Sequence, residues 1–202
     1  MTFDLDGVIC RPPFGINVGI SRNLHLPPLP ATVPPRPAHH RHGLRGRLRL
    51  LLHSLRYLGR GPMPDARAGL LAIREFREPL LVTARSAVIL PLIEAWLRRF
   101  DLLDCFAAVY ANDTALRAAQ FKLHRVRALG AAEHVDDDGA TAYYLARHGL
   151  PRVYLRDWPL NRALPYPPTV QVVGSLIEIA DHLAREDCQR AQTIRDGQGI
   201  QD

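Results

Sequence analysis

Two carboxylates that stand two residues apart, near the start of the chain, are its best candidates for chemistry. Asp4 and Asp6 follow a short apolar stretch and precede Gly7, which lets the chain turn sharply. Residues i and i+2 of a strand point to the same side, so both acids can converge at the strand's carboxyl end. Neighbouring carboxylates repel unless a cation or a shared proton lies between them. The pattern favours a divalent metal with oxygen ligands, most simply Mg²⁺, and a plain strand end with an Asp-Gly turn is the alternative.

Three other features carry side chains suited to the same chemistry. Thr83 ends an apolar run, Lys122 is the only lysine in the chain, and residues 136–138 are three successive aspartates. Each has an ordinary alternative, because a threonine can simply end a strand and a lysine is usually solvated. Acidic residues also cap helices, and this is the role we expect for Asp138.

Two further polar residues are candidates for binding a substrate. Arg85 lies two residues after Thr83, where it either binds the distal part of a substrate or pairs with an acid. Asn112 follows the apolar run of residues 106–110, at the correct edge for a site, and its alternative is a turn.

The elements that must position these residues are read from the hydrophobic pattern. After a first strand that ends at Asp4, strands are expected at residues 79–83, 106–110, 133–135, 152–156 and 170–173. Helices are expected at residues 66–77, 87–99, 114–129, 141–148 and 175–186, the first of them capped by Asp65. Strands that alternate with helices imply parallel βαβ units and a three-layer α/β domain. In such sheets ligands bind at the carboxyl ends of the strands, which is where the acids and Thr83 fall.

Residues 11–63 differ from this regular pattern and are read as a cap-like insertion. Residues 7–64 hold nine of the 26 basic residues and no acid, which leaves 17 basic against 20 acidic residues elsewhere. The segment is rich in proline, and leucines at helical spacing predict one amphipathic helix within residues 44–58. A cap-like insertion that is rich in arginine and free of acids suits an anionic substrate or partner. The alternative is a disordered loop with a solvated basic helix.

Composition and patterning exclude several classes of protein. Three scattered cysteines form neither a disulfide framework nor a zinc pair, so a cytoplasmic setting is expected. No run approaches the roughly 18 apolar residues of a membrane span, and no basic and then apolar leader precedes the acidic motif. Residues 188–202 read as a polar tail that frays. Only Met1 to Phe3 precede Asp4, so the central strand is expected to be short at its start.

Four motifs, in order, resemble those of the haloacid dehalogenase (HAD)-like superfamily of phosphotransferases. They are Asp4 to Val8, Leu81 to Thr83, Lys122 within Gln-Phe-Lys-Leu, and Val135 to Asp137. The resemblance implies a three-layer Rossmann-like parallel sheet, with a core at residues 1–10 and 64–187 and a small basic cap insertion after the first strand. Residues 156–162 are faintly similar to a segment of nucleotidase-like members, and a structural loop anchored by Trp158 is the alternative.

The resemblance also implies a role for each motif. Asp4 would be the nucleophile that forms an aspartyl-phosphate, and Asp6 would be the general acid and then the base. Thr83 would bind a phosphoryl oxygen, and Lys122 would place its positive charge against the nucleophile.

The implied cofactor is Mg²⁺, held by Asp4, the backbone carbonyl of Asp6 and Asp136, with Asp137 acting through water. The expected function is a Mg²⁺-dependent phosphatase of a small phosphomonoester, a nucleotide or a sugar phosphate. A non-hydrolytic module that holds an anionic polymer or a membrane surface with the Arg-rich insertion is the alternative. A transferase that uses an acceptor other than water is a third hypothesis.

Overall fold

A parallel sheet forms the middle layer of the protein, whose computed structural model describes residues 1–17, 20–35, 59–162 and 164–198. Within these residues the sheet has six strands in the order β3-β2-β1-β4-β5-β6, and every neighbouring pair is parallel. The strands are β1 (Thr2–Phe3), β2 (Leu80–Ser86), β3 (Ala108–Asn112), β4 (Glu133–Asp136), β5 (Arg152–Arg156) and β6 (Val170–Val173). The expected parallel α/β sheet is confirmed.

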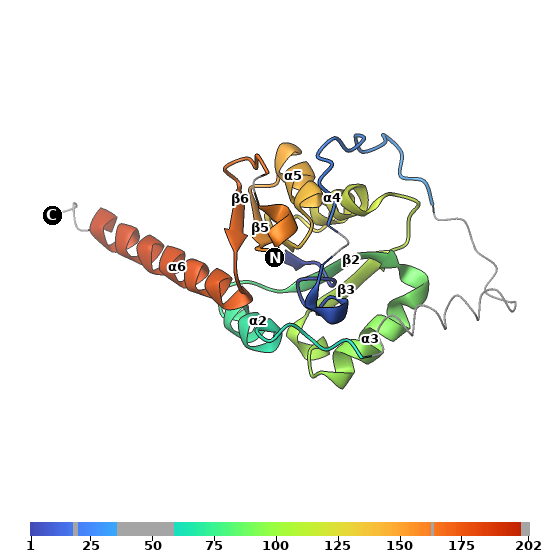
Figure 1. Cartoon of the computed structure of the whole chain (residues 1–202). Coiled ribbons are helices and arrows are strands. Elements are labelled where there is room, and N and C mark those ends of the chain that lie inside the picture. The colour runs from blue at the N-terminus through green and yellow to red at the C-terminus, as the bar shows by residue number, and fades with distance from the viewer. Residues whose placement is uncertain (18–19, 36–58, 163, 199–202) are drawn as a thin grey trace, which may run out of the picture.

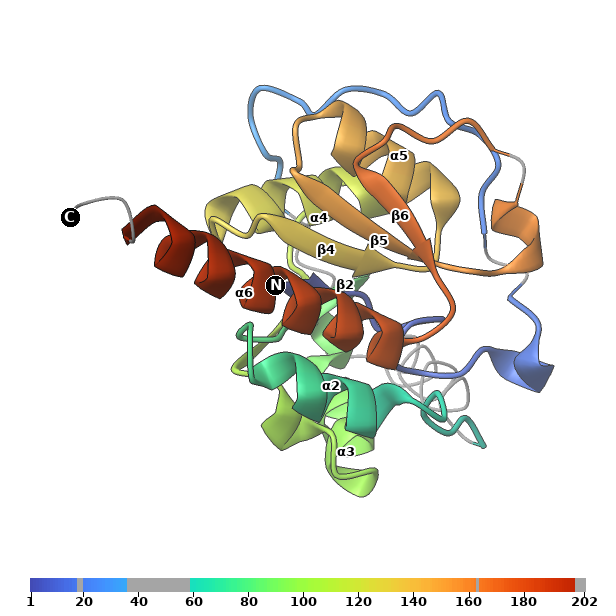
Figure 2. The same ribbon diagram turned by 90° about the vertical axis from the view of Figure 1, so that its left-hand side faces the viewer.

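Helices cover both faces of this sheet, as Figures 1 and 2 show. One face carries α2 (Ala66–Arg74), α3 (Leu90–Arg99) and α6 (Leu176–Gln198), and the other carries α4 (Ala118–Ala128) and α5 (Gly139–Arg147). Single 3₁₀ turns are η1 (Pro13–Gly15), η2 (Ala87–Ile89), η3 (Leu103–Cys105) and η4 (Pro159–Asn161). Among the described residues, no helix is both long and apolar enough to cross a membrane.

The central strand β1 is as short as the sequence suggests, and its register places the first acid. Thr2 and Phe3 are fully buried, and Phe3 lies opposite Leu81 of β2 and Val135 of β4. The backbone amide of Asp4 donates to the carbonyl of Val135 at 2.9 Å. Because β1 ends at the level where β4 reaches its own aspartates, the acids of the two strands meet at one edge.

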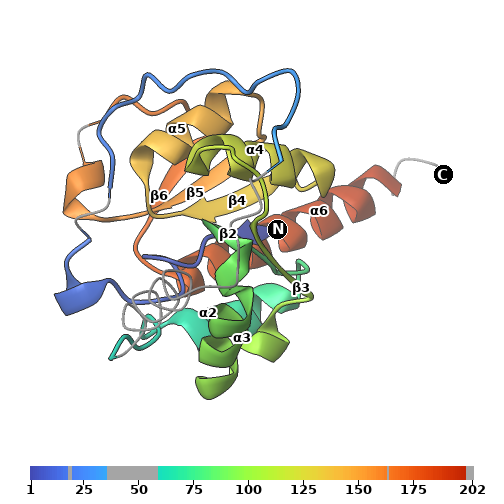
Figure 3. The same ribbon diagram turned by 90° about the vertical axis from the view of Figure 1, so that its right-hand side faces the viewer.

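The observed bounds differ from the expected ones mainly at the C-terminus. The helix α6 continues past the expected end near residue 186 to Gln198, so the expectation that the chain frays after Cys188 is wrong for residues up to 198. Residues 187–198 include three glutamines and two arginines, which are good helix formers. Figures 1 and 3 show this helix extending away from the sheet.

The first half of the basic insertion crosses the molecule as an extended strap. Residues 20–35 run over the face that carries α4 and α5 (Figures 2 and 3). The side chain of Gln120 donates to the backbone carbonyls of Pro27 and Pro28, at 3.3 and 2.8 Å. Proline excludes regular helix here and leaves these carbonyls for side-chain donors. The helix predicted within residues 44–58 lies outside the described residues.

Asp65 precedes α2 but does not cap it, so that expectation is wrong. Its carboxylate accepts two hydrogen bonds from Arg156 at the end of β5, at 2.7 and 3.2 Å. It also accepts a hydrogen bond of 2.6 Å from the backbone amide of Leu176, the first residue of α6. A buried arginine and a free helix N-terminus outcompete the local cap, since both offer the carboxylate charge-assisted donors.

Candidate active site

A pocket of about 390 Å³ lies at the carboxyl ends of β1 and β2, beside the loop that follows β4. The structure brings six of the eight candidate residues to its lining, namely Asp4, Asp6, Thr83, Arg85, Lys122 and Asp137. Asp136 lies next to it and is fully buried. Asn112 is not part of the lining.

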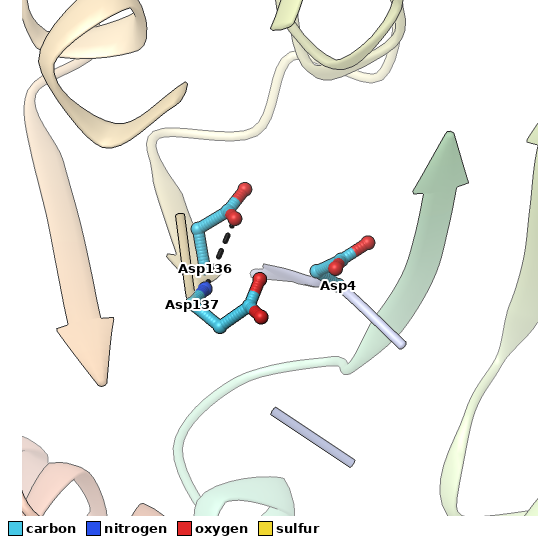
Figure 4. A group of neighbouring side chains, drawn as sticks. All are labelled: Asp4, Asp136 and Asp137. Carbon is cyan, nitrogen blue, oxygen red and sulfur yellow. Dashed lines mark hydrogen bonds between the residues drawn. The ribbon is translucent and has the colours of Figure 1, made fainter. Parts of the chain in front are cut away.

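Asp4, Asp136 and Asp137 form one acidic cluster. Each offers a carboxylate oxygen, and these oxygens lie within 4.8 Å of one another. Figure 4 shows the three side chains converging from β1 and the end of β4. Burial is the largest cause that raises the pKa of Asp4, to about 7, while Lys122 opposes the shift. Burial and the charges of Asp4 and Asp136 raise the pKa of Asp137 as well.

Lys122 joins two of these acids from the helix α4. Its Nζ lies 2.8 Å from Asp136 Oδ2 and 3.1 Å from Asp4 Oδ1, and the side chain is 4% exposed. Burial disfavours the ammonium charge, but the carboxylates of Asp136 and Asp4 outweigh it and raise the pKa of Lys122. The alternative of a solvated helix lysine is therefore excluded, and Lys122 is a fixed positive charge beside Asp4.

The carboxylate of Asp136 has both of its oxygens fully engaged. Oδ1 accepts hydrogen bonds from the backbone amides of Asp137 and Asp138, both at 3.0 Å. Oδ2 faces Lys122 Nζ at 2.8 Å and His134 Nε2 at 2.9 Å. Burial works against the charge, yet Lys122 and the hydrogen bond with His134 lower the pKa of Asp136. A carboxylate has about four acceptor positions, and here each one is used.

Gly7 makes room for the acidic cluster. Its backbone has φ +72°, a conformation that favours glycine, and a Cβ placed there would lie 2.0 Å from Asp137 Oδ2. The same carboxylate accepts a short hydrogen bond from the side-chain amide of Asn17, in the insertion. Sequence reasoning missed Asn17, because a lone asparagine in an irregular segment carries no signal of its partner.

Asp6 is held between two arginines. Its Oδ1 lies 2.8 Å from Arg60 Nη1, and its Oδ2 lies 2.7 Å from Arg85 Nε. Burial opposes ionisation, but the hydrogen bonds and charges of Arg85 and Arg60 outweigh it and lower the pKa of Asp6. Arg85 therefore pairs with an acid and also lines the pocket. Arg60, at the end of the insertion, is a second residue that sequence reasoning missed, because nothing distinguishes it from the other eight arginines of residues 7–64.

Thr83 and Asn112 have different surroundings. Thr83 is 1% exposed and lines the pocket, where its hydroxyl oxygen accepts a hydrogen bond of 3.3 Å from the amide of Arg85. The amide of Asn112 donates to the carbonyl of Leu116, and its Oδ1 accepts from the backbone and hydroxyl of Thr114. These contacts favour the turn as the role of Asn112. They also explain why α4 begins at Ala118 and not near residue 114.

The loops below the pocket are fixed by polar side chains. Asp138 accepts a hydrogen bond of 3.1 Å from the amide of Thr141, which confirms it as the cap of α5. In the segment of residues 156–162, Asn161 donates to the carbonyl of Asp137 at 2.8 Å. Trp158 donates its indole N–H to the carbonyl of Gly7 at 3.3 Å. These contacts fit the structural alternative for this segment.

Comparisons with known proteins identify the fold. No protein-family model matches the sequence, and no curated protein matches it. Among solved structures, a haloacid dehalogenase-like hydrolase from Streptococcus pneumoniae has a TM-score of 0.58 at 13% identity, covering 90% of this chain and 96% of that one. The phosphate complex of CbbY from Rhodobacter sphaeroides has a TM-score of 0.56 at 14% identity, covering 88% and 94%. An uncharacterized Listeria monocytogenes protein has a TM-score of 0.53 at 17% identity, covering 91% and 95%.

Identities this low bear on the fold alone. The match covers 96% and 94% of the two named hydrolase and CbbY chains, with TM-scores of 0.58 and 0.56, so the similarity extends over the whole fold. The chain therefore has the haloacid dehalogenase-like fold.

Proposed function

We propose that the protein is a Mg²⁺-dependent phosphatase that hydrolyses a small phosphomonoester through a phosphorylated Asp4. One observation carries this proposal: the only lysine of the chain is buried between Asp4 and Asp136, at the ligand-binding edge of the sheet. The similarity to a hydrolase and to a phosphate-bound structure supports it.

The acidic cluster fits a divalent metal. Asp4 and Asp137 lie side by side, and both have a raised pKa because burial and like charge disfavour their ionised forms. A divalent cation relieves both costs, and its preferred ligands are oxygens. Asp137 suits direct binding better than Asp136, whose oxygens are all engaged, so we exchange the roles first expected for them. Asp4, Asp137 and the backbone carbonyl of Asp6 would hold Mg²⁺, which supplies charge that neutralises the phosphoryl group.

The first chemical step forms the phosphoenzyme. A carboxylate oxygen of Asp4 attacks phosphorus, the bond from phosphorus to the leaving oxygen breaks, and Asp6 gives that oxygen its proton. Lys122 balances the negative charge on the nucleophile, and the hydroxyl of Thr83 donates to a phosphoryl oxygen. A carboxylate is a weak nucleophile, so this fixed geometry supplies much of the rate.

The second step releases phosphate. Asp6, now ionised, takes a proton from water, whose oxygen attacks phosphorus and frees the carboxylate of Asp4. The ionised Asp6 of this structure is already suited to this step, because Arg85 and Arg60 stabilise its charge. For the first step these ion pairs have to loosen and Asp6 has to take up a proton from solvent, because the ionised carboxylate has none to give. An anionic group on the distal part of the substrate, such as a second phosphate on a sugar or a nucleotide, would draw Arg85 away from Asp6.

Hydrolysis of p-nitrophenyl phosphate with and without Mg²⁺, followed by a panel of phosphomonoesters, tests the proposal. We expect Mg²⁺-dependent turnover that falls at least about a thousandfold in Asp4→Asn. Asp187→Asn is the matched control, since Asp187 is exposed on α6. Turnover retained in Asp4→Asn, or none on any substrate, would contradict the proposal. Product analysis separates hydrolysis from transfer to another acceptor. The helix on which the alternative binding module rests lies outside the described residues.

A further inference from the structure

Two buried polar side chains lie under the site and take no part in the mechanism above. Thr2, on β1, and His134, on β4, are both fully buried, and their residues pair across the two strands. His134 Nε2 lies 2.9 Å from Asp136 Oδ2, and His134 Nδ1 lies 2.8 Å from the hydroxyl oxygen of Thr2. Together they form a chain of contacts that runs from Thr2 on β1, through His134 on β4, to Asp136 of the acidic cluster.

The partners of His134 determine where its proton lies. Both oxygens of Asp136 already accept hydrogen bonds, Oδ1 from two backbone amides and Oδ2 from the ammonium group of Lys122, so the ring nitrogen that faces Oδ2 must donate. In a neutral ring the other nitrogen then accepts, and the hydroxyl of Thr2 is its donor. That hydroxyl also donates to the carbonyl of Glu133 at 3.1 Å, and the ring nitrogen Nδ1, at 2.8 Å, is the nearer of the two acceptors that share its hydrogen.

The hydrogen bond from His134 fixes the plane of Asp136. Without it, Oδ2 would keep only Lys122 as a partner, and the carboxylate could turn about the two backbone amides that hold Oδ1. Lys122 would move with it, because its Nζ is placed by Asp136 on one side and Asp4 on the other. A displaced ammonium group would neutralise the charge of the nucleophile less well.

We propose that Thr2 and His134 are positioning residues for Lys122. Thr2 fixes the Nε2–H tautomer of His134, this N–H orients Asp136, and Asp136 holds the ammonium group of Lys122 against Asp4. The catalytic consequence rests on the proposed phosphatase function, whereas the geometric arrangement does not.

A measurement that needs no activity tests the arrangement. Lys122 is the only lysine, so selective ¹³C labelling of lysine gives a single side-chain signal in NMR spectra. We expect His134→Asn to shift this signal, because the shorter amide reaches Thr2 but not Asp136. His134→Gln should restore it, since its amide reaches the position of Nε2. His182→Asn is the control for an unrelated histidine. A lysine signal that His134→Asn leaves unchanged would overturn the proposal.

The tautomer is tested in samples of the same variants labelled with ¹⁵N histidine. The ¹⁵N chemical shifts of the imidazole, assigned by their loss in His134→Asn, should show a protonated Nε2 and a bare Nδ1 at neutral pH. Thr2→Ser should keep this pattern and Thr2→Val should weaken it. A protonated Nδ1 in the wild type would overturn the role of Thr2.

Kinetics test the catalytic consequence. We expect His134→Asn to lower kcat about 10- to 100-fold with KM and the Mg²⁺ requirement nearly unchanged, and His134→Gln to recover most of the rate. In a Lys122→Met background, His134→Asn should cost little more, because it acts through the lysine. If the losses of kcat in the two single variants simply multiply in the double variant, and all variants are equally stable to heat, then His134 does not act through Lys122. If the wild type hydrolyses no phosphomonoester, the proposed function fails while the NMR results still decide the arrangement.

Discussion

Lys122 balances the charges of the site at the scale of single residues. Two carboxylates, Asp4 and Asp136, share its ammonium group, and none of the three side chains is more than 8% exposed. A buried ion pair gains little over an apolar core, but the loss of one partner leaves a buried charge without compensation. The same side chain should therefore matter to stability and to chemistry, unlike an ion pair on the surface.

Lys122→Met tests this difference. We expect a loss of about 3–5 kcal/mol in the free energy of unfolding at neutral pH without metal, because two buried carboxylates lose their cation. The control is Arg98→Met, since Arg98 is 60% exposed in its pair with Glu94 and its loss should cost less than about 1 kcal/mol. Urea denaturation of both variants gives the comparison. Equal losses would mean that Lys122 is not the buried counter-charge described here.

Gly7→Ala tests the space beside Asp137. The added Cβ meets the carboxylate at 2.0 Å and also adopts an unfavourable φ of +72°. Gly130→Ala shares the positive φ, at +61°, but its Cβ meets nothing within 4 Å, so it measures the backbone cost alone. We expect both variants to lose about 1 kcal/mol of stability from the backbone, and only Gly7→Ala to lose Mg²⁺-dependent turnover as well. Equal activity in the two variants would remove the steric argument.

At the scale of elements, glycine also sets how closely two helices approach. In α2, a Cβ on Gly69 would lie 2.3 Å from the Cβ of Leu176 and 3.0 Å from its backbone carbonyl carbon. The helices α2 and α6 can only pack at this distance because Gly69 has no side chain. Asp65 and Arg156 add polar contacts at the same corner, which joins β5 to both helices.

Gly69→Ala should therefore reverse the usual order of helix propensity. Alanine in an open helix site is about 1 kcal/mol more favourable than glycine. Here we expect a loss of about 1–3 kcal/mol, because backbone atoms of α6 have to move. The exposed neighbour Ala68, changed to glycine, measures the propensity term alone. Thermal unfolding of both variants checks the sign, and a more stable Gly69→Ala would contradict the close approach of α2 and α6.

The sequence predicted the helices and strands better than the contacts between residues far apart in the chain. Alternating apolar runs and helical periods located the strands and the helices α2 to α6, because local patterns report burial. Asp4, Thr83, Lys122 and Asp137 were candidates because each lies at a predicted strand end or in a motif that resembles those of the superfamily, and the structure brings all four to one pocket. Asn17 and Arg60 were not, because their roles depend on how a long irregular segment returns to the sheet. Local sequence does not encode such contacts.

At the scale of the whole molecule, the buried acids link folding to pH. Asp4 has a pKa of about 7 in the folded protein against an ordinary value of 3.8. Between these two pH values the folded state keeps a proton that the unfolded chain has lost, so the free energy of unfolding falls as pH rises. Asp6 and Asp136 have lowered pKa values, so their contribution to stability is lost only in acid, as the pH falls below the ordinary pKa of an aspartate. The metal-free protein should thus weaken from about pH 4 to pH 7.

If the proposed function is right, Mg²⁺ should reverse this trend, because the deprotonated carboxylates would bind it and only the folded chain brings them together. We expect the rise in Tm on adding Mg²⁺ to be small near pH 5 and to grow through about pH 8, as Asp4 and Asp137 lose their protons. Asp137→Asn should abolish most of the rise, whereas Asp187→Asn should leave it intact. Differential scanning fluorimetry across this range, with and without chelator, measures the effect. A rise in Tm that is independent of pH, or that persists in Asp137→Asn, would place the cation at another site. The raised pKa values of Asp4 and Asp137 would then have no connection with metal binding.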